Sequence, residues 1–136
     1  MRLFRVLFIA TIVSIVTGCG VTHPITCSPT EHAVVVESLY FGTAKSEGIV
    51  TAEDWKAFVG AVVTPAFPDG FTTWAASGQW RMSTGTIRQE PSHVLQLTHD
   101  GSPQNDRAIE HIMKTYKDEF RQEAVMRVHS QACRSF

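Results

Sequence analysis

Apolar residues recur along this chain with two periods, one typical of strands and one typical of helices. Residues 34–41 are mostly β-branched or aromatic and apolar at both alternating sets of positions, which predicts a strand covered on both faces. Thr51 and Asp54 resemble a capping box, and the apolar residues after them fall at i, i+3, i+4, i+7 and i+8. This spacing predicts an amphipathic helix that ends at Pro65, followed by a turn over 67–70.

A hairpin is predicted in the middle of the chain. Residues 71–82 read as a strand that is broken or bulged at 77–78. Residues 83–86 contain a glycine and predict the turn. Residues 87–98 read as a second strand, interrupted by Pro91, a residue that belongs at a sheet edge or a bulge.

The last third of the chain predicts a second helix and a final strand. Ser102 or Asn105 can cap the helix, and its apolar stripe consists of Ile109, Ile112, Met113, Tyr116 and Phe120. The final strand is predicted over 124–130. The order β-α-β-β-α-β predicts an α+β protein with the ferredoxin-like split βαβ arrangement, in which an antiparallel four-stranded sheet carries two helices on one face. Residues 33–136 form this single domain.

The first predicted strand has a consequence for partners. Both helices of this fold cover the same face of the sheet, yet Val36 and Tyr40 alternate with Leu39 and Phe41, so both faces of the strand are expected to be buried. A partner, a second copy, a ligand or the chain's own tail would then cover the far face. A homodimer through the open sheet face is the simplest of these expectations.

The N-terminus predicts export and a lipid anchor. Arg2 and Arg5 precede an uncharged apolar run over 6–16, which is too short to span a bilayer and is typical of a secretory signal rather than of a buried cytosolic helix. Residues 16–19 resemble the lipobox of bacterial lipoproteins, although an ordinary cleaved signal is the alternative. We therefore expect a signal peptide over residues 1–18 and an acylated Cys19 bearing diacylglycerol and palmitate.

Several acyl chains hold a protein at a membrane stably, whereas one chain is marginal. Residues 19–32 are expected to form the lipidated N-terminus and a tether. Gly20 follows the cysteine, which favours sorting to the outer membrane, with the domain facing the periplasm of the bacterial cell envelope.

Charge narrows the class of partner. Without residues 1–18 the chain keeps 118 residues and a formal charge of −3, because the removed segment contains two of the twelve basic residues and none of the thirteen acidic ones. No cluster of Lys and Arg is present, which argues against nucleic-acid binding. The expected partner is the membrane, through the lipid anchor, and no cofactor is expected.

Two further cysteines suit an oxidising compartment. Cys27 and Cys133 lie near the start of the first strand and the end of the last strand, which are neighbours in this fold. A disulfide is the favoured interpretation. A free thiol and a metal ligand are the alternatives, and no C-x-x-C spacing supports a metal.

Several motifs occur in one order along the domain. They are residues 39–42 (LYFG), 55–58 (WKAF), 64–70 (TPAFPDG), 78–80 (GQW), 88–92 (RQEPS) and 122–125 (QEAV). Together they resemble the bacterial family carrying domain of unknown function 3574, whose members are often lipoproteins. The resemblance covers nearly all of residues 27–136, with Ala124 in place of an expected serine. It implies export and a small α+β fold, and it implies no activity or catalytic residue.

Polar and aromatic residues gather on the predicted hairpin and its neighbours. The candidate ligand-binding residues are Tyr40, Trp80, Arg81, Arg88 and Glu90, with Glu123 nearby on another strand. They predict a pocket lined by arginine and aromatic side chains that binds a small anion. The alternative is a structural network in which Glu90 pairs with an arginine and the tryptophan packs against the sheet.

Histidines and serines carry no recognisable catalytic pattern. His93 and His99 lie six residues apart on one strand, about 20 Å, which is too far to share an ion. No histidine pair has the helical i, i+4 spacing of a zinc site, and no G-x-S-x-G motif is present. We expect no metal site and no catalytic residue. The sequence favours a lipid-anchored, non-catalytic binding or assembly domain. The alternative is a small enzyme of the dimeric α+β barrel type that acts on a small molecule.

Overall fold

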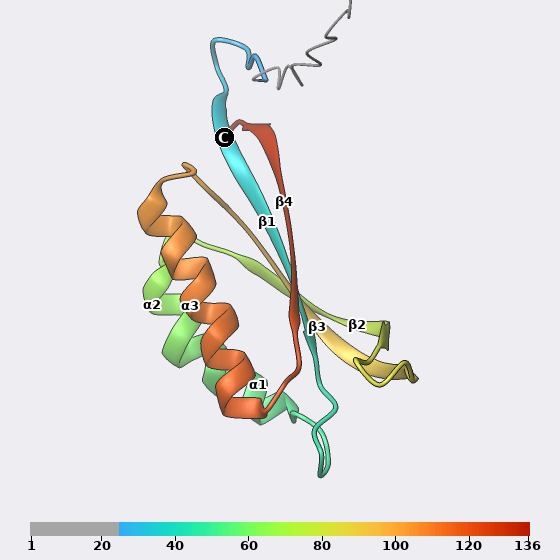
Figure 1. Ribbon diagram of the computed structural model, residues 1–136. Helices are drawn as coiled ribbons and strands as arrows, with labels where there is room; N and C mark the ends of the chain where they lie inside the picture. Colours follow the sequence, from blue (N-terminus) through green and yellow to red (C-terminus); the bar gives the residue numbers. More distant parts are fainter. Residues whose placement is uncertain (1–24) are drawn as a thin grey trace, which may run out of the picture.

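Four strands form one sheet in the computed structural model, which describes residues 25–136 (Figure 1). They are β1 (His32–Gly42), β2 (Thr72–Arg81), β3 (Ile87–His99) and β4 (Val125–Arg134). All neighbours are antiparallel, in the spatial order β2-β3-β1-β4. This order confirms the predicted α+β class and the split βαβ arrangement. The predicted signal peptide and Cys19 lie outside the described residues.

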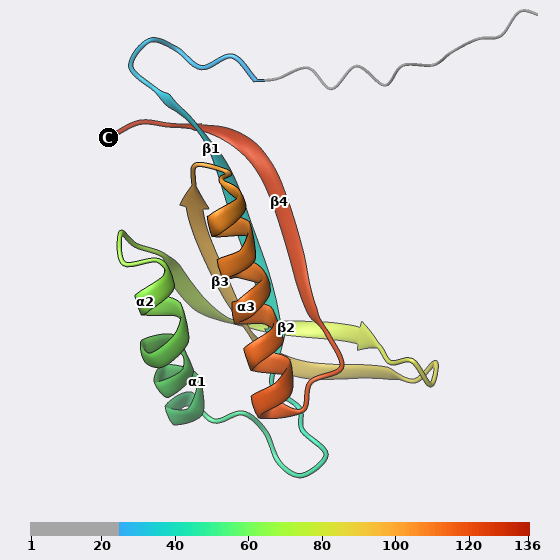
Figure 2. The same cartoon turned by 60° about the vertical axis from the view of Figure 1, so that its left-hand side comes forward.

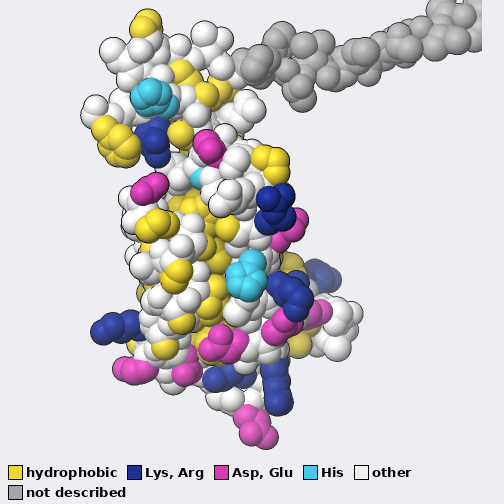
Figure 3. All heavy atoms as spheres, turned by 90° about the vertical axis from the view of Figure 1, so that its left-hand side faces the viewer, with side chains coloured by type: hydrophobic (Ala, Val, Ile, Leu, Met, Phe, Trp, Pro, Cys, Tyr) yellow, Lys and Arg dark blue, Asp and Glu magenta, His cyan; other side chains and the backbone are white. Residues whose placement is uncertain are grey.

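Two helical segments cover the same face of the sheet, as expected (Figures 1 and 2). The first consists of α1 (Ala52–Phe58), a π-helical turn η1 (Val59–Val63) and α2 (Thr64–Ala66), and the second is α3 (Pro103–Phe120). Ser102 caps α3, because its hydroxyl accepts a hydrogen bond from the Asn105 N–H. Seen from this side, hydrophobic side chains form a band with charged side chains around it (Figure 3).

The first helical segment continues through Pro65, which the sequence predicted as its end. Thr51 caps the segment as expected, in a reciprocal capping box with Asp54. In a regular α-helix the ring of a proline meets the carbonyl four residues earlier. Here a wider π turn precedes Pro65, and the Thr64 N–H bonds the Val59 carbonyl five residues back. The prediction was wrong because it did not consider a π turn, which opens the space that the ring needs.

The hydrophobic core lies between the helices and the sheet. Its aromatic members pack against one another at steep angles: the Phe41 ring lies 4.7 Å from the Tyr116 ring and 5.1 Å from the Trp55 ring, between centroids. The other large buried side chains are Leu39, Phe58, Val63, Phe67, Leu95, Leu97, Ile109, Ile112 and Phe120. Edge-to-face pairs of this kind stabilise the fold beyond the area that they bury.

Strands β2 and β3 run without the predicted interruptions. Their register is constant from Thr72 opposite Gln96 to Arg81 opposite Ile87, so no bulge occurs at Gly78. A strand can contain a glycine without a bulge when its pairing with the neighbouring strand keeps a constant register. The residues around Gly78 alone do not reveal that pairing. The predicted break was therefore wrong.

Pro91 occupies a local edge of β3 rather than a bulge. The pairing of β1 with β3 ends at Gly42 opposite Ser92, the residue that follows Pro91. The Pro91 carbonyl accepts hydrogen bonds from the Thr43 N–H at 3.2 Å and the Thr43 hydroxyl at 2.7 Å. The nitrogen of Pro91 faces this same side, where β1 has ended and no ladder partner requires an N–H donor.

A disulfide joins the ends of the two neighbouring strands. Strand β4 extends to Arg134, beyond the predicted end at residue 130, and places Cys133 opposite Ala33 on β1. Cys27 bonds Cys133, with 5.5 Å between their Cα atoms. The structure thus has the disulfide that the sequence favoured.

The sheet face away from the helices is only partly covered. Leu39 and Phe41 on the helix side are fully buried, whereas Tyr40 on the other side keeps 37% of its surface exposed. Within the single chain Tyr40 is thus not fully covered, and the expectation that a partner, a second copy or a ligand covers the far face of β1 stays a prediction. Val94 on this open face is buried because Tyr40 and Trp74 flank it as cross-strand neighbours.

Candidate functional site

A pocket of about 600 Å³ lies on the open face of the sheet, at the end where β1 stops and β4 starts. Its floor consists of small residues: Gly42, Ala44, Ala76, Gly78, Ser92 and Ala124. Side chains of alternate residues point to one face of a strand, so a run of small residues on neighbouring strands leaves a hollow. The pocket exists because these positions lack bulk.

Large side chains form the walls of this hollow. Tyr40, Trp80 and Met126 stand around it on three different strands, and Met82 closes it near the hairpin turn. Tyr40, Trp80 and Met126 are each partly exposed. The lining also includes charged residues, which are Lys45, Arg88, Glu90, Arg121 and Glu123. A concave site that combines aromatic walls with polar groups is typical of small-molecule binding.

The Glu90 carboxylate is held in place at one side of the pocket. Its Oε2 atom accepts a hydrogen bond of 2.6 Å from the Ala44 N–H. Its Oε1 atom lies against Gly42, where a Cβ atom would come within 2.8 Å. Real Cβ atoms do not approach so closely, so glycine at position 42 is required for this placement of the carboxylate.

Arg88 lies on the same face of β3 as Glu90 and directly opposite Trp80. Within the described chain, neither Arg88 nor Glu90 forms a salt bridge. The structural alternative, in which Glu90 pairs with an arginine, is therefore not formed. Glu123 also lines the pocket, and its carboxylate accepts a hydrogen bond from the Ser83 N–H at 3.0 Å.

The structure brings four of the five candidate residues together and separates the fifth. Tyr40, Trp80, Arg88 and Glu90 all line the pocket. Arg81 pairs with Ile87 in the register of the hairpin and so points to the opposite face. Both arginines lie at one end of the sheet, as the sequence predicted, but the alternation of side chains along the strands places them on opposite faces.

Helix α3 and the segment that follows it hold the backbone beside the pocket. The Tyr116 hydroxyl donates a hydrogen bond of 2.9 Å to the Gly42 carbonyl, and the Gln122 amide donates one of 2.8 Å to the Ala44 carbonyl. Burial, together with the negative charges of Glu90 and Asp54, raises the pKa of Tyr116 well above its usual range, so the hydroxyl remains a donor. These bonds hold the backbone that positions Glu90.

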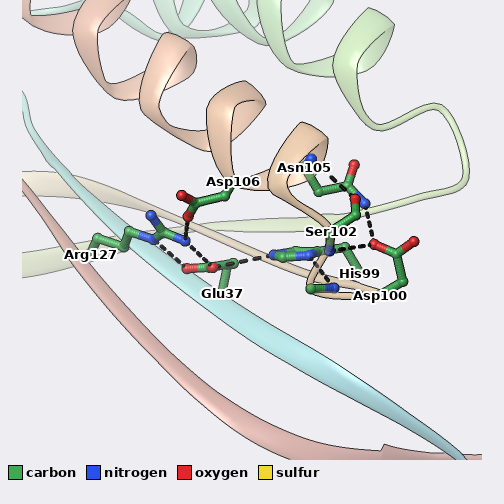
Figure 4. A network of polar contacts seen from close by, with 8 residues as sticks. Glu37, His99, Asp100, Ser102, Asn105, Asp106 and Arg127 are labelled. Atoms are coloured by element: carbon green, nitrogen blue, oxygen red, sulfur yellow. Dashed lines mark hydrogen bonds and ion pairs between the residues drawn. The ribbon is translucent and has the colours of Figure 1, made fainter.

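A second polar group is buried between the sheet and the start of α3 (Figure 4). Glu37 on β1 is fully buried, and its carboxylate receives two hydrogen bonds from the Arg127 guanidinium, at 2.9 and 2.6 Å. The same guanidinium bonds Asp106 on α3 at 2.7 Å. His99 Nδ1 accepts the Gly101 N–H, so its Nε2 carries the proton and faces Glu37 at 3.2 Å.

This cluster is structural in character. Burial alone would raise the pKa of Glu37, but the hydrogen bonds from Arg127 and His99 outweigh it and hold the pKa below 4.5. Both oxygens of the carboxylate have partners, and the group does not line the pocket. This cluster was not predicted from the sequence. The available signal was one acidic residue on the otherwise apolar face of β1 that carries Leu39 and Phe41.

The two histidines of β3 have separate packing roles. The His93 ring stacks on Trp55 at 4.5 Å, and burial lowers its pKa below 6.5. His99 belongs to the Glu37 cluster. Over residues 25–136 no group of three or more His, Cys, Asp or Glu side chains could hold a metal ion. In the same range no helix is long and apolar enough to cross a membrane.

Solved structures with this fold include an enzyme. A phage SAM lyase in complex with S-methyl-5'-thioadenosine is similar with a TM-score of 0.59 and 14% identity, over 76% of this chain and 90% of the lyase. Its apo state has a TM-score of 0.56 and 13% identity, over 84% and 95%. CutA from Synechococcus elongatus has a TM-score of 0.50 and 8% identity, over 76% and 80%. These likenesses show the fold alone.

Sequence comparison gives the family. No curated protein is significantly similar to this chain. Residues 36–136 match the family described as "Protein of unknown function (DUF3574)". This match begins within β1 and extends to the last residue, so it includes the whole pocket and the buried cluster. The chain therefore belongs to the DUF3574 family.

Proposed function

We propose that this protein is a lipid-anchored receptor of the bacterial cell envelope that binds a small molecule in the pocket on the open sheet face. The observation that supports this most is the hollow of about 600 Å³, with a floor of small residues and walls that include Tyr40, Trp80 and Met126. No described group in it forms a nucleophile–base pair, so binding is favoured over catalysis.

The ligand has an apolar part and an anionic group. Trp80 and Tyr40 offer flat apolar surfaces, and Arg88 opposite Trp80 offers a guanidinium without a carboxylate partner among the described residues. Arginine binds carboxylates, sulfonates and phosphates through parallel hydrogen bonds. A ligand whose ring packs against Trp80 or Tyr40 and whose acid group binds Arg88 would contact both features.

The test is binding of 8-anilinonaphthalene-1-sulfonate, an aromatic sulfonate whose fluorescence rises in apolar sites. Gly78→Val fills the floor, and a Cβ there meets Ser92 Oγ at an ordinary 3.5 Å, so the fold tolerates the change. We expect the variant to lose about tenfold or more in affinity. Gln89→Val, on the opposite face of the same hairpin, is the matched control. Equal binding by the wild type and Gly78→Val would refute the site.

The anchor is proposed at Cys19, with the domain attached to the outer membrane and facing the periplasm. The leader pattern over residues 1–18 supports export, and the disulfide between Cys27 and Cys133 suits an oxidising compartment. Mass spectrometry of the native N-terminal peptide tests it, with Cys19→Ala as the unmodified control. A mature protein with a free Cys19 thiol would contradict the proposal.

The alternative is a small enzyme, and the fold shared with a phage SAM lyase is the observation in its favour. Incubation with SAM followed by chromatography for S-methyl-5'-thioadenosine tests this alternative directly. Formation of that product by the wild type but not by Gly78→Val would favour the enzyme over the receptor.

The homodimer expected from the sequence also stays a prediction. Trp74, Tyr40 and Met126 lie in one cross-strand row on the open face and are partly exposed. A second copy could cover this row. Sedimentation velocity of the wild type and of Trp74→Ser tests the dimer, and a monomeric wild type would exclude it.

A further inference from the structure

We propose that the pocket selects zwitterions, molecules that carry a primary ammonium group beside their anionic group, and that Glu90 is the residue that imposes this choice. This inference rests on the proposed function, because it specifies the ligand of the same pocket. Glu90 provides a negatively charged contact in addition to the apolar wall and the positively charged Arg88.

Glu90 is held as a fixed acceptor. One oxygen is occupied by the Ala44 N–H at 2.6 Å, and the backbone of this segment is in turn held by Gln122 at 2.8 Å. The other oxygen, Oε1, lies over Gly42 and has no hydrogen-bond partner within residues 25–136. A carboxylate that is anchored through one oxygen presents the other to the pocket with little freedom to move away.

The free oxygen requires a donor. A carboxylate oxygen accepts hydrogen bonds and attracts positive charge, so a purely anionic ligand beside it is repelled. Arg88 has the opposite requirement, since its guanidinium donates only. The two residues are separated by one position on β3, about 7 Å between Cα atoms, and both face the pocket. Two charges of opposite sign at this spacing, of which Glu90 is held in place by the Ala44 N–H, complement a ligand that carries both.

The surrounding residues limit the rest of the ligand. Trp80 stands opposite Arg88, and Gly78 stands opposite Glu90. The ammonium group therefore enters over the glycine, where there is space, and the apolar part lies against the tryptophan. A compact zwitterion with an aromatic or aliphatic side chain, such as an apolar α-amino acid, meets these requirements.

Three compounds that share a phenyl ring separate the contribution of the anionic group from that of the ammonium group. Phenylalanine carries both charges, 3-phenylpropanoate carries only the anion, and 2-phenylethylamine carries only the cation. The full-length protein is purified in detergent micelles and titrated by calorimetry, with empty micelles as the blank. We expect phenylalanine to bind about tenfold or more tightly than either other compound.

Variants assign this preference to Glu90. Glu90→Gln should weaken phenylalanine about tenfold and leave 3-phenylpropanoate unchanged or stronger. Gly42→Ala keeps the charge but displaces the carboxylate, since its Cβ would lie 2.8 Å from Oε1, and should give the same profile. Glu119→Gln, an exposed carboxylate on α3, is the matched control and should bind like the wild type.

The possible failures are distinguishable. If 3-phenylpropanoate binds as tightly as phenylalanine and Glu90→Gln changes neither, the zwitterion proposal is wrong while the pocket remains a receptor for anions. If none of the three compounds binds and 8-anilinonaphthalene-1-sulfonate is also insensitive to Gly78→Val, the receptor function itself is wrong.

Discussion

Replacing Arg127 by methionine should destabilise the protein strongly, in a way that depends on pH. The side chain of Arg127 donates two hydrogen bonds to Glu37, which is fully buried on β1, and one to Asp106 on α3. Methionine has a similar length but no charge and no donor. The substitution therefore leaves a carboxylate in the core with His99 as its remaining partner.

The expected loss at pH 7 is about 3–5 kcal/mol in the free energy of unfolding, the range for removing one partner of a buried ion pair. The cost of protonating Glu37 leads to a loss of similar size. Without the guanidinium, Glu37 avoids the burial of its charge by taking up a proton. Protonation at pH 7 of a carboxyl with an ordinary pKa of 4.5 costs about 3.4 kcal/mol, at about 1.4 kcal/mol per pH unit.

The loss of stability in Arg127→Met should therefore depend on pH. In the wild type the pKa of Glu37 is held below 4.5, so the carboxylate stays charged and its contribution is constant between pH 7 and 4.5. In Arg127→Met the folded state binds an extra proton, so the deficit should shrink by up to about 1.4 kcal/mol for each pH unit down to 4.5. Urea unfolding followed by tryptophan fluorescence measures both quantities.

Two controls accompany this measurement. The double variant Glu37→Gln/Arg127→Met lacks the Glu37 carboxyl group, so its deficit should not show the decrease with falling pH that is expected of Arg127→Met. Arg107→Met removes an exposed arginine from α3 and should cost no more than about 0.5 kcal/mol. A loss below about 1 kcal/mol in Arg127→Met, or a deficit that does not change with pH, would refute the account of a buried charge held by its partner.

Three further predictions concern other parts of the fold. Tyr116→Phe removes the hydrogen bond to the Gly42 carbonyl and should cost about 1 kcal/mol in urea unfolding; an unchanged midpoint would contradict this support of the pocket. Replacing Cys27 and Cys133 by serine should cost about 2–5 kcal/mol, measured in the same way against the oxidised wild type; equal stability would mean that the bond adds nothing. Because the pKa of His93 is lowered, the unfolded chain binds a proton at this residue more readily than the folded chain does. The contribution of the neutral His93 ring to stability is therefore complete above pH 6.5 and decreases as the pH falls below 6.5. In His93→Phe the free energy of unfolding should vary less with pH between 8 and 5.5 than in the wild type. An unchanged pH dependence would contradict this role of His93.

The order of elements was predictable because it depends on local patterns. The helical stripe that includes Ile109, Ile112 and Tyr116 and the capping box at Thr51 indicate their elements without knowledge of the rest of the chain. The errors arose at positions whose conformation depends on a neighbouring strand. Pro91 is compatible with a strand because β1 ends beside it, and Gly78 is compatible because β3 keeps the register. Neither fact is contained in the residues around those positions.

The candidate site was predictable in part for the same reason. Aromatic and charged residues on one hairpin indicated Trp80, Arg88 and Glu90, and strand alternation alone could have excluded Arg81. The hollow itself was not predictable from single residues. It depends on small residues of several strands meeting on one face, and Gly42 takes part only because Glu90 lies over it.

The disulfide and the pocket lie at opposite ends of β1. Ala33 is opposite Cys133, and Gly42 lies nine residues further along the strand, a distance of about 30 Å. With the acyl chains proposed at Cys19, only eight residues separate the bilayer from Cys27, a length of at most about 29 Å. In the lipid-anchored protein proposed above, the length of β1 would separate the anchored end of the sheet from the pocket. Such a separation would favour the capture of solutes from the surrounding water over the extraction of lipids from the membrane.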